Sequence, residues 1–280
     1  MRSCKLPSGA AIPVLGLGTW RMGESSRIRA QELDALKYGI ELGYPMIDTA
    51  EMYGEGTAEE IVGEAMQGQG KGTRDKLYIV SKVYPHNASR AGTVAACERS
   101  LKRLKTDRLD LYLLHWRGGS RLEETFEAFH RLREAGKIRD FGVSNFDRDD
   151  MEDAARLDKT LNGSNQILYC LSRRGPEYDL LPWMLKRGIP CMAYSPLDQG
   201  GLLRKPALKK IADSIGITPA QLALAWLLAQ PGVVTIPKSA SRERVQENFA
   251  AAEIKLSKET LAELDKAFPS LKGKQSLEML

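Results

Sequence analysis

Cysteine is scarce in this chain, and its spacing excludes two common uses. Among 280 residues there are four cysteines, with no CxxC pair and no Cys/His spacing typical of a zinc site. Neither a disulfide framework nor a metal site is therefore expected. The four are expected to be free thiols in a reducing compartment: Cys4, Cys97, Cys170 and Cys191.

Long hydrophobic runs are also missing. The longest, such as residues 220–229, fall short of the about 20 apolar residues that a membrane-spanning helix needs. The first five residues lead into Pro-Ser-Gly instead of an apolar stretch, so no signal peptide is expected. We therefore expect a cytoplasmic protein without a membrane partner.

Charge of one sign is not concentrated anywhere. The net charge of +5 is spread along the chain, and the densest basic patch, residues 205–210, is short. That patch fits a solvated surface stretch at least as well as an anion site. Nothing resembles a nucleic-acid module, so no nucleic-acid partner is expected.

Three functional fingerprints are incomplete. Residues 16–21 begin like the GxGxxG motif, but Arg21 replaces its third glycine. Residues 68–72 lack the preceding glycine and the Ser or Thr of a P-loop. Ser144 and Ser195 lack the GxSxG surroundings of a nucleophile elbow and are explained as well by strand-end capping. A nicotinamide cofactor, if bound, is not held by a Rossmann turn.

What the chain does contain is a recurring unit: a short apolar run, a polar residue, a polar loop and a stretch with helical spacing. This pattern is typical of strands that alternate with helices. We predict an α/β fold, a single (β/α)8 TIM barrel over residues 1–280, with residues 6–13 forming an N-terminal β-hairpin that closes its bottom. The runs are 14–17, 46–47, 77–80, 109–114, 141–143, 166–169, 190–193 and 233–236.

Four reactive side chains lie at the ends of three successive runs: Asp48, Tyr53, Lys82 and His115. Taken singly, Asp48 could equally cap a helix, Lys82 could be a surface lysine, and His115 could be a core histidine. In a parallel barrel, however, the strand exits meet at one rim, where active sites are built. Together the four residues predict a proton-transfer site.

The chemistry of this set is coherent. A tyrosine hydroxyl titrates near about 10 and is a poor acid at neutral pH. A nearby ammonium favours the phenolate, and a buried ammonium needs a carboxylate partner. We therefore predict a Tyr53–Lys82–Asp48 chain in which Tyr53 is a tuned general acid, with His115 orienting an oxygen beside it. Such a site suits protonation of a carbonyl oxygen whose carbon accepts a hydride.

A phosphate site is predicted at residues 236–239, which precede a helix that starts near residues 241–242. Amides at a helix N-terminus attract anions. Lys238 and Arg244 would add charge-assisted hydrogen bonds to a phosphate.

Seven segments resemble the aldo-keto reductases, in the right order from about residue 16 to residue 248. They are DTAEMYG at 48–54, Lys82 in SKV, His115–Trp116 in LLHW, GVSN at 142–145, NQ at 165–166, YSPL at 194–197 and IPKS at 236–239. Residues 177–183, EYDLLPW, resemble bacterial members, including a methylglyoxal-reductase-like branch.

The resemblance implies an oxidoreductase that reduces aldehydes and ketones to alcohols with NADPH and without a metal. By position, the catalytic residues would be Asp48, Tyr53, Lys82 and His115, with Tyr53 as the proton donor, and the substrate pocket would be walled by Trp20, Tyr53, His115 and Trp116. The cofactor-binding residues would be Gly18, Thr19, Trp20, Asp48, Ser144, Asn145, Gln166, Tyr194, Ser195, Leu197, Lys238, Ser239, Arg244, Glu247 and Asn248. Of these, residues 144, 145 and 166 would bind the nicotinamide carboxamide, Tyr194 would stack on its ring, and residues 238–248 would hold the adenosine end with its 2′-phosphate.

The chain departs from the family pattern near the substrate. Arg117 stands where proline is usual, and Asp198 where glycine is common. The resemblance therefore does not determine the substrate specificity. The segment after Phe268 is short and polar, which predicts an open, unselective pocket. Glu51 either faces that pocket or caps its loop, and we favour the second. Methylglyoxal and related 2-oxoaldehydes, aromatic aldehydes and sugar-derived ketones all remain candidate substrates, and a monomer or weak homodimer is expected.

Two other functions compete with carbonyl reduction. One is an NADPH-binding, redox-sensing subunit with little turnover, although the sequence adds no partner-binding extension. The other is a barrel aldolase that uses Lys82 as a Schiff-base amine. The aldolase leaves Tyr53 and the segment at 236–239 unexplained.

Overall fold

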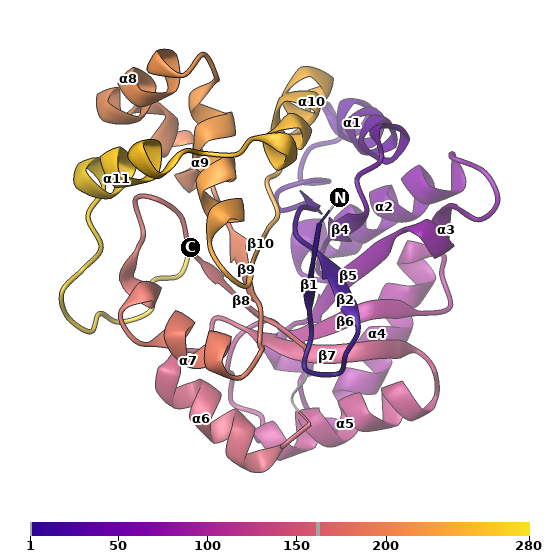
Figure 1. Cartoon of the computed structure of the whole chain (residues 1–280). Helices are drawn as coiled ribbons and strands as arrows, with labels where there is room; N and C mark the ends of the chain where they lie inside the picture. Colours follow the sequence, from indigo (N-terminus) through magenta and orange to yellow (C-terminus); the bar gives the residue numbers. More distant parts are fainter. Residues whose placement is uncertain (1, 161–162) are drawn as a thin grey trace.

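Eight parallel strands form a closed (β/α)8 barrel in the computed structural model, which describes residues 2–160 and 163–280 (Figure 1). Neighbouring strands follow chain order from β3 to β10. The first and last strands meet where Leu15 bridges Thr235 and Gly18 bridges Lys238, both in parallel. The barrel strands are β3 (Leu17–Gly18), β4 (Met46–Asp48), β5 (Tyr78–Val83), β6 (Leu109–Leu114), β7 (Ile138–Ser144), β8 (Asn165–Leu168), β9 (Cys191–Tyr194) and β10 (Val233–Thr235).

Helices cover the outside of the barrel and connect its strands (Figure 1). Helix α9 (Pro219–Ala229) begins at a capping box formed by Thr218 and Gln221. Ser241 likewise caps α10 by accepting a hydrogen bond from the Arg244 amide. The helices are α1 (Arg29–Leu42), α2 (Thr57–Gln67), α3 (Thr73–Lys76), α4 (Arg90–Leu104), α5 (Leu122–Glu134), α6 (Arg148–Leu157), α7 (Leu180–Lys186), α8 (Pro206–Ser214), α9 (Pro219–Ala229), α10 (Arg242–Ala250) and α11 (Lys258–Ala267).

The predicted N-terminal hairpin closes one end of the barrel. Strands β1 (Ser3–Lys5) and β2 (Ala11–Pro13) pair antiparallel and lie in front of the barrel strands in Figure 1. Leu6 and Ile12 are buried in one cluster with inward-facing side chains of the strands: Met46, Val80, Leu111, Leu113, Met192, Val234 and Ile236. The barrel interior is therefore apolar at this end, and polar side chains inside the barrel are left to the opposite rim.

Strand β5 is longer than the sequence pattern predicts, and this changes the position of Lys82. The expected run ended at residue 80 with Lys82 beyond it, but the strand continues to Val83, and Lys82 pairs with Leu113 of β6. Successive side chains of a strand point to opposite faces. Ser81 bonds Glu59 of α2, whereas Lys82 bonds the Asp48 carboxylate at the end of β4. Polar residues extend the strand here because each has a partner on its own face.

No single helix among the described residues has the length and apolar composition to cross a membrane. Helices α8 and α9 meet that test only as a pair, with a bend of 86° between them.

Candidate active site

Lys82 joins the reactive side chains into one buried cluster. Its ammonium donates to Asp48 Oδ2 at 2.9 Å, to the Thr49 carbonyl at 2.8 Å and to the Tyr53 hydroxyl at 3.1 Å. An ammonium has three N–H donors, and all three are used. The Lys82 side chain is fully buried, and that of Asp48 is 2% exposed. The predicted Tyr53–Lys82–Asp48 chain is therefore present.

The loop after β4 brings Tyr53 back over Lys82. Tyr53 opens the short 3-10 helix η1 (Tyr53–Gly56), and Gly54 within it has a φ of 54°. A side chain at Gly54 would come within 2.9 Å of the Met22 carbonyl oxygen, so glycine is needed for both the backbone angle and the close approach. The Tyr53 ring is held under this loop, with the Lys82 ammonium 4.7 Å from its centroid.

Burial and the neighbouring charges shift the pKa values of this cluster in opposite directions. Burial acts to lower the pKa of Lys82, but Asp48 and Tyr53 outweigh it and raise that pKa, so the ammonium is retained. Burial raises the pKa of Asp48 and is opposed by Lys82 and Gln166. Burial also raises the pKa of Tyr53, and the opposing charge of Lys82 does not overcome it. Lys82 favours the phenolate as predicted, but burial has the larger effect on the pKa of Tyr53, so the phenol stays protonated at neutral pH.

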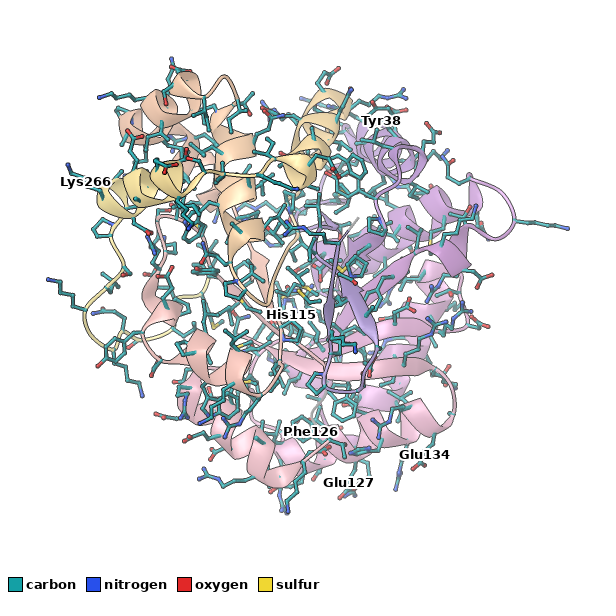
Figure 2. All side chains as sticks on the ribbon, viewed as in Figure 1. Tyr38, His115, Phe126, Glu127, Glu134 and Lys266 are labelled. Carbon is teal, nitrogen blue, oxygen red and sulfur yellow. The ribbon has the colours of Figure 1, made fainter. Side chains whose placement is uncertain are left out.

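His115 follows directly after β6 and lies near the centre of the molecule (Figure 2). Its ring is edge-on to Tyr53, with 5.6 Å between the ring centroids. The Nδ1 atom is buried and has no hydrogen-bond partner among the described residues. Burial, helped by the charge of Lys82, lowers the pKa of His115 well below its ordinary value. His115 is therefore a neutral imidazole at pH 7.

Gln166 extends the cluster across the barrel to β7 and β8. Its amide donates to Asp48 Oδ1 at 2.7 Å, so both oxygens of that carboxylate are bonded. Ser144, the last residue of β7, donates its hydroxyl to the Gln166 carbonyl at 2.8 Å. The Asp48 carboxylate is thereby fixed from two sides of the barrel.

Asn145 forms a second bridge over the rim. It adopts a φ of 58°, which asparagine tolerates better than most residues, and it donates its amide to the His115 carbonyl at 3.0 Å. The Tyr194 hydroxyl donates to Asn145 Oδ1 at 2.9 Å. The strand ends of β6, β7 and β9 are thus connected by side-chain hydrogen bonds.

These residues surround a cavity of about 310 Å³ at the barrel rim. Trp20 and Trp116 are among its walls, as predicted for a substrate pocket, whereas Lys82 lies behind Tyr53 and does not face it. The lining residues are Gly18, Trp20, Asp48, Met52, Tyr53, His115, Trp116, Ser144, Asn145, Gln166, Tyr194, Ser195, Pro196, Ile236, Lys238, Met279 and Leu280.

A larger groove of about 700 Å³ continues from this cavity. The two share Trp20, Ser195, Pro196 and Lys238. All of the predicted cofactor residues line one or both spaces except Thr19, which is buried and donates its hydroxyl to the Asp48 carbonyl at 3.0 Å. The predicted residues in the groove are Trp20, Ser195, Leu197, Lys238, Ser239, Arg244, Glu247 and Asn248.

The groove has the features that a dinucleotide phosphate needs. It passes the N-terminus of α10, where backbone amides favour anions. Lys238 and Arg244 line it, and neither forms an ion pair within residues 2–160 and 163–280. The groove leads into the smaller cavity beside Tyr53, so an elongated cofactor fits with one end at each site. No group of three or more potential metal ligands occurs in the same residue ranges.

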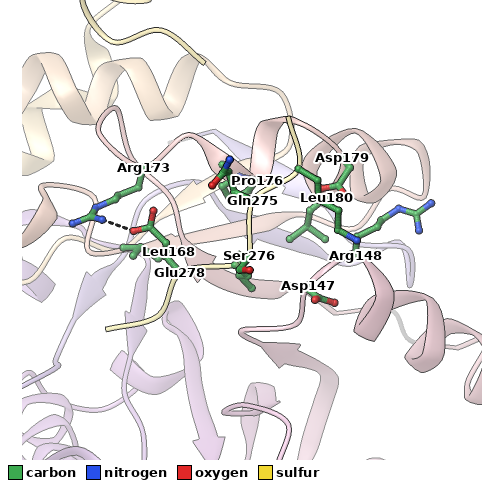
Figure 3. A pocket seen from close by; sticks show the side chains of 13 residues that line it. Asp147, Arg148, Leu168, Arg173, Pro176, Asp179, Leu180, Gln275, Ser276 and Glu278 are labelled. Atoms are coloured by element: carbon green, nitrogen blue, oxygen red, sulfur yellow. Dashed lines mark hydrogen bonds and ion pairs between the residues drawn. The ribbon is translucent and has the colours of Figure 1, made fainter. Parts of the chain in front are cut away.

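The C-terminal segment closes part of the cavity, contrary to the open pocket predicted from its length. Figure 3 shows Glu278 reaching Arg173, with which it forms an ion pair, and Lys274 donates to Asp149 Oδ2 at 3.1 Å. These contacts guide the chain back across the rim, where Met279 and Leu280 line the cavity. Because Arg173 and Glu278 are 105 positions apart, no local pattern could reveal their contact.

Sequence reasoning also missed Met52, Pro196 and Ile236 in the cavity wall. Each of the three adjoins a residue that was predicted, or a predicted strand end. A rule that includes the neighbours of each strand exit would have found them. Met279 and Leu280 carried no such signal.

The three residues whose roles the sequence left open have charged or polar partners in the structure. Glu51 is not among the cavity-lining residues, as favoured, but it accepts hydrogen bonds from the loop after β5 instead of capping its own loop. Arg117 forms ion pairs with Asp150 and Asp153 of α6. Asp198 accepts hydrogen bonds from the side chains of residues 172 and 173.

Comparison with known proteins agrees with this geometry. Residues 14–268 match the model of the Aldo/keto reductase family. The chain belongs to the aldo/keto reductase family. It is 50% identical to methylglyoxal reductase YeaE of Escherichia coli (strain K12) over 96% of both chains. It is 36% identical to glyoxal reductase of Bacillus subtilis (strain 168), with 93% of this chain and 91% of that protein covered.

A solved aldo-keto reductase structure has the same fold. The enzyme from Klebsiella pneumoniae in complex with NADPH superposes with a TM-score of 0.94 at 48% identity, covering 100% of this chain and 99% of the other. The predicted family and barrel are therefore confirmed, as is NADP(H) as the cofactor of this aldo/keto reductase.

The depressed pKa of His115 predicts a pH-dependent contribution to stability. In the unfolded chain His115 binds a proton as the pH falls below about 6.5, whereas in the folded chain it does not until well below that value. The contribution of neutral His115 is therefore complete above about pH 6.5 and is lost as the pH falls towards its folded pKa. We expect the unfolding free energy of His115→Gln to fall less steeply than that of the wild type between pH 6.5 and 5, by up to about 1.4 kcal/mol per pH unit. Urea unfolding at several pH values measures this, and parallel slopes would contradict it.

Proposed function

We propose that this chain reduces small carbonyl compounds, above all 2-oxoaldehydes such as methylglyoxal, to alcohols with NADPH, and that Tyr53 donates the proton. The observation that carries the proposal is the buried Lys82 ammonium, bonded to Tyr53 and Asp48 at the wall of a cavity that opens into the groove. The similarity to a methylglyoxal reductase and a glyoxal reductase supports the choice of substrate.

Tyr53 has the chemistry of a proton donor at neutral pH. Its phenol is protonated, faces the cavity and is bonded to a cation. NADPH, when bound, supplies a hydride to the carbonyl carbon. The carbonyl oxygen, which gains an electron pair as its double bond opens, takes the proton from the Tyr53 hydroxyl. The Lys82 ammonium stabilises the phenolate that remains, and Asp48 in turn compensates that ammonium.

His115 has a different task. A neutral imidazole carries one N–H donor and one acceptor nitrogen, and the His115 ring lies beside the Tyr53 ring at the cavity wall. We assign it the orientation of the carbonyl oxygen through a hydrogen bond. Because its pKa is depressed, it does not compete with Tyr53 as the proton donor at neutral pH.

The cofactor would occupy the groove and extend into the cavity. Its nicotinamide end belongs beside the cluster formed by Ser144, Asn145 and Gln166, with Tyr194 as the stacking partner. The phosphates of its adenosine end belong beside Lys238, Ser239 and Arg244, with Glu247 and Asn248 close to the adenine. Both assignments rest on the lining residues and on the family pattern.

Cavity size favours compact substrates. A volume of about 310 Å³ is at the lower end of the roughly 300 to 1,000 Å³ common for small-molecule sites. Met279 and Leu280 occupy part of the rim and add apolar surface. The nicotinamide end of the cofactor shares this cavity, so the remaining space suits two-carbon and three-carbon oxoaldehydes, and single-ring aromatic aldehydes are the largest substrates we expect.

The structure disfavours the aldolase alternative. A Schiff-base lysine must present a free amine to its substrate, but Lys82 uses all three N–H donors, has a raised pKa and does not face the cavity. Tight NADPH binding without turnover of any carbonyl would instead favour the redox-sensing alternative.

The cellular setting is proposed with the function. We propose one barrel domain over residues 1–280, in a cytoplasmic monomer or weak homodimer. In support, the four cysteines are free thiols, and three of them are buried, as suits a reducing compartment.

Replacing Tyr53 by Phe is the direct test of the proton donor. We expect kcat for methylglyoxal to fall by about 10²- to 10⁴-fold, because the general acid is lost, while the Kd for NADPH stays nearly unchanged. Phe keeps the buried ring but leaves one Lys82 donor without its acceptor, so circular dichroism is used to check that the variant folds. NADPH oxidation at 340 nm and fluorescence titration of NADPH give the two values. An equal loss of cofactor affinity would show that the assignment of Tyr53 is wrong.

Replacing Arg244 or Lys238 by Ala tests the phosphate end of the groove. Loss of one charge-assisted bond to the 2′-phosphate costs about 1.5 to 3 kcal/mol, so the Kd for NADPH should rise by about 10- to 100-fold and that for NADH much less. Arg242→Ala is the matched control, because Arg242 lies on the same helix but pairs with Asp34 and Glu41 outside the groove. Equal losses for both cofactors would contradict the placement.

A further inference from the structure

We propose that Glu51 is a positioning residue that fixes the width of the substrate cavity and so selects compact carbonyls over bulky ones. The proposal rests on the function proposed above and deepens it. Glu51 does not face the cavity, and its effect is transmitted through the loop that follows β5.

The Glu51 carboxylate is buried and fully engaged. Its side chain is 7% exposed. Oε1 accepts hydrogen bonds from the Tyr84 amide at 2.8 Å and from the Asn87 side chain at 3.0 Å. Oε2 accepts a hydrogen bond from Nη2 of Arg99, on α4, at 3.4 Å. One carboxylate therefore holds the loop of residues 84–87 against the segment that follows β4.

That loop supports an aromatic wall of the cavity. The Tyr84 ring meets the Trp116 ring edge-on at 5.2 Å between centroids, with an interplanar angle of 85°. Pro85 packs so closely against Gly118 that a side chain there would lie 2.6 Å from its Cβ. Trp116 lines the cavity, and Tyr84 stands behind it. The position of the indole therefore depends on the loop that Glu51 anchors.

Another part of the cavity wall is attached to Glu51 directly. Met52 and Tyr53 are the next two residues of the chain, and both line the cavity. The same carboxylate thus ties the segment with the proton donor to the loop behind Trp116. Tyr53 and Trp116 both line the cavity, so Glu51 supports two parts of its wall.

Removing the carboxylate should loosen this wall. The Tyr84 amide and the Asn87 side chain would lose a shared acceptor, and partly buried donors without a partner are unfavourable. The loop can regain hydrogen bonds only by moving towards water, which withdraws support from Trp116. A compact carbonyl then loses contacts and alignment, whereas a bulky flat carbonyl gains room.

The experiment compares two substrates in matched variants. We measure kcat and KM for methylglyoxal and for benzaldehyde in the wild type, Glu51→Ala and Tyr84→Leu. The ratio of the two kcat/KM values should fall about tenfold in Glu51→Ala, at the lower end of the roughly 10- to 200-fold that one methylene group controls in a pocket. Tyr84→Leu should reproduce the change although its carboxylate is intact. The Kd for NADPH should stay near the wild-type value in both.

Two controls separate hydrogen bonding from charge. Glu51→Gln keeps an oxygen that can accept from Tyr84 and Asn87, and should restore the wild-type ratio. Arg99→Met removes only the exposed ion pair and should also keep the ratio. If Gln is as damaging as Ala and the alkaline limb of the pH–rate profile shifts, Glu51 acts by charge on Tyr53 and the proposal is overturned.

The remaining outcomes are also decisive. Wild-type turnover with an unchanged ratio in both Glu51→Ala and Tyr84→Leu overturns the positioning role and leaves the proposed function intact. A wild type that reduces neither carbonyl overturns the proposed function, and the positioning role with it. Circular dichroism of each variant identifies any that fail to fold. If Glu51→Ala does not fold, Asn87→Ala, which removes one donor to the same carboxylate, takes its place in the comparison.

Discussion

The structure of this site depends on one buried cation. Transfer of a lysine ammonium into a barrel interior is unfavourable unless each of its donors is satisfied. Lys82 meets that condition with one carboxylate, one backbone carbonyl and one phenol, and all three come from the segment of residues 48–53. Loss of one partner of a buried ion pair typically costs about 3 to 5 kcal/mol. The ion pair therefore constrains where β4, β5 and the loop after β4 can lie.

The rest of the barrel makes this arrangement possible. The N-terminal hairpin and the inward-facing apolar residues fill one end, so polar side chains gather at the other. There the strand ends are cross-linked by side-chain hydrogen bonds: Gln166 fixes the free oxygen of Asp48, and Asn145 connects β6 with β9. A rigid rim of this kind keeps the proton donor and the neutral imidazole in a constant relation, and alignment of reacting groups is a large part of catalysis.

Much of this could be predicted from the sequence because each strand of the barrel and the residue that follows it leave a pattern in consecutive residues. A strand exit is marked by a polar residue after an apolar run, and eight exits in a parallel barrel must share a rim. Hence Asp48 and His115 were predicted at the positions where they lie, whereas Gln166, which lies inside β8, was predicted only through the family resemblance.

Features that depend on partners elsewhere in the chain were harder to predict from the sequence. Lys82 lies within β5 and not beyond it, because its partner is on another strand. The net rise of the Tyr53 pKa was not predicted because burial, the larger effect, has no signature in the residue types. Met279 and Leu280 line the cavity at the end of a segment whose Lys274 and Glu278 contact residues more than a hundred positions away.

The measurement that tests the central claim most directly is a double-mutant cycle on kcat/KM with Tyr53→Phe and Lys82→Met. If Lys82 acts through the Tyr53 phenol, its replacement should reduce carbonyl reduction strongly in the wild type and hardly at all once that phenol is absent, since residues in direct contact are not additive. Fully additive losses would contradict the account, because they would mean that Lys82 contributes to catalysis without Tyr53.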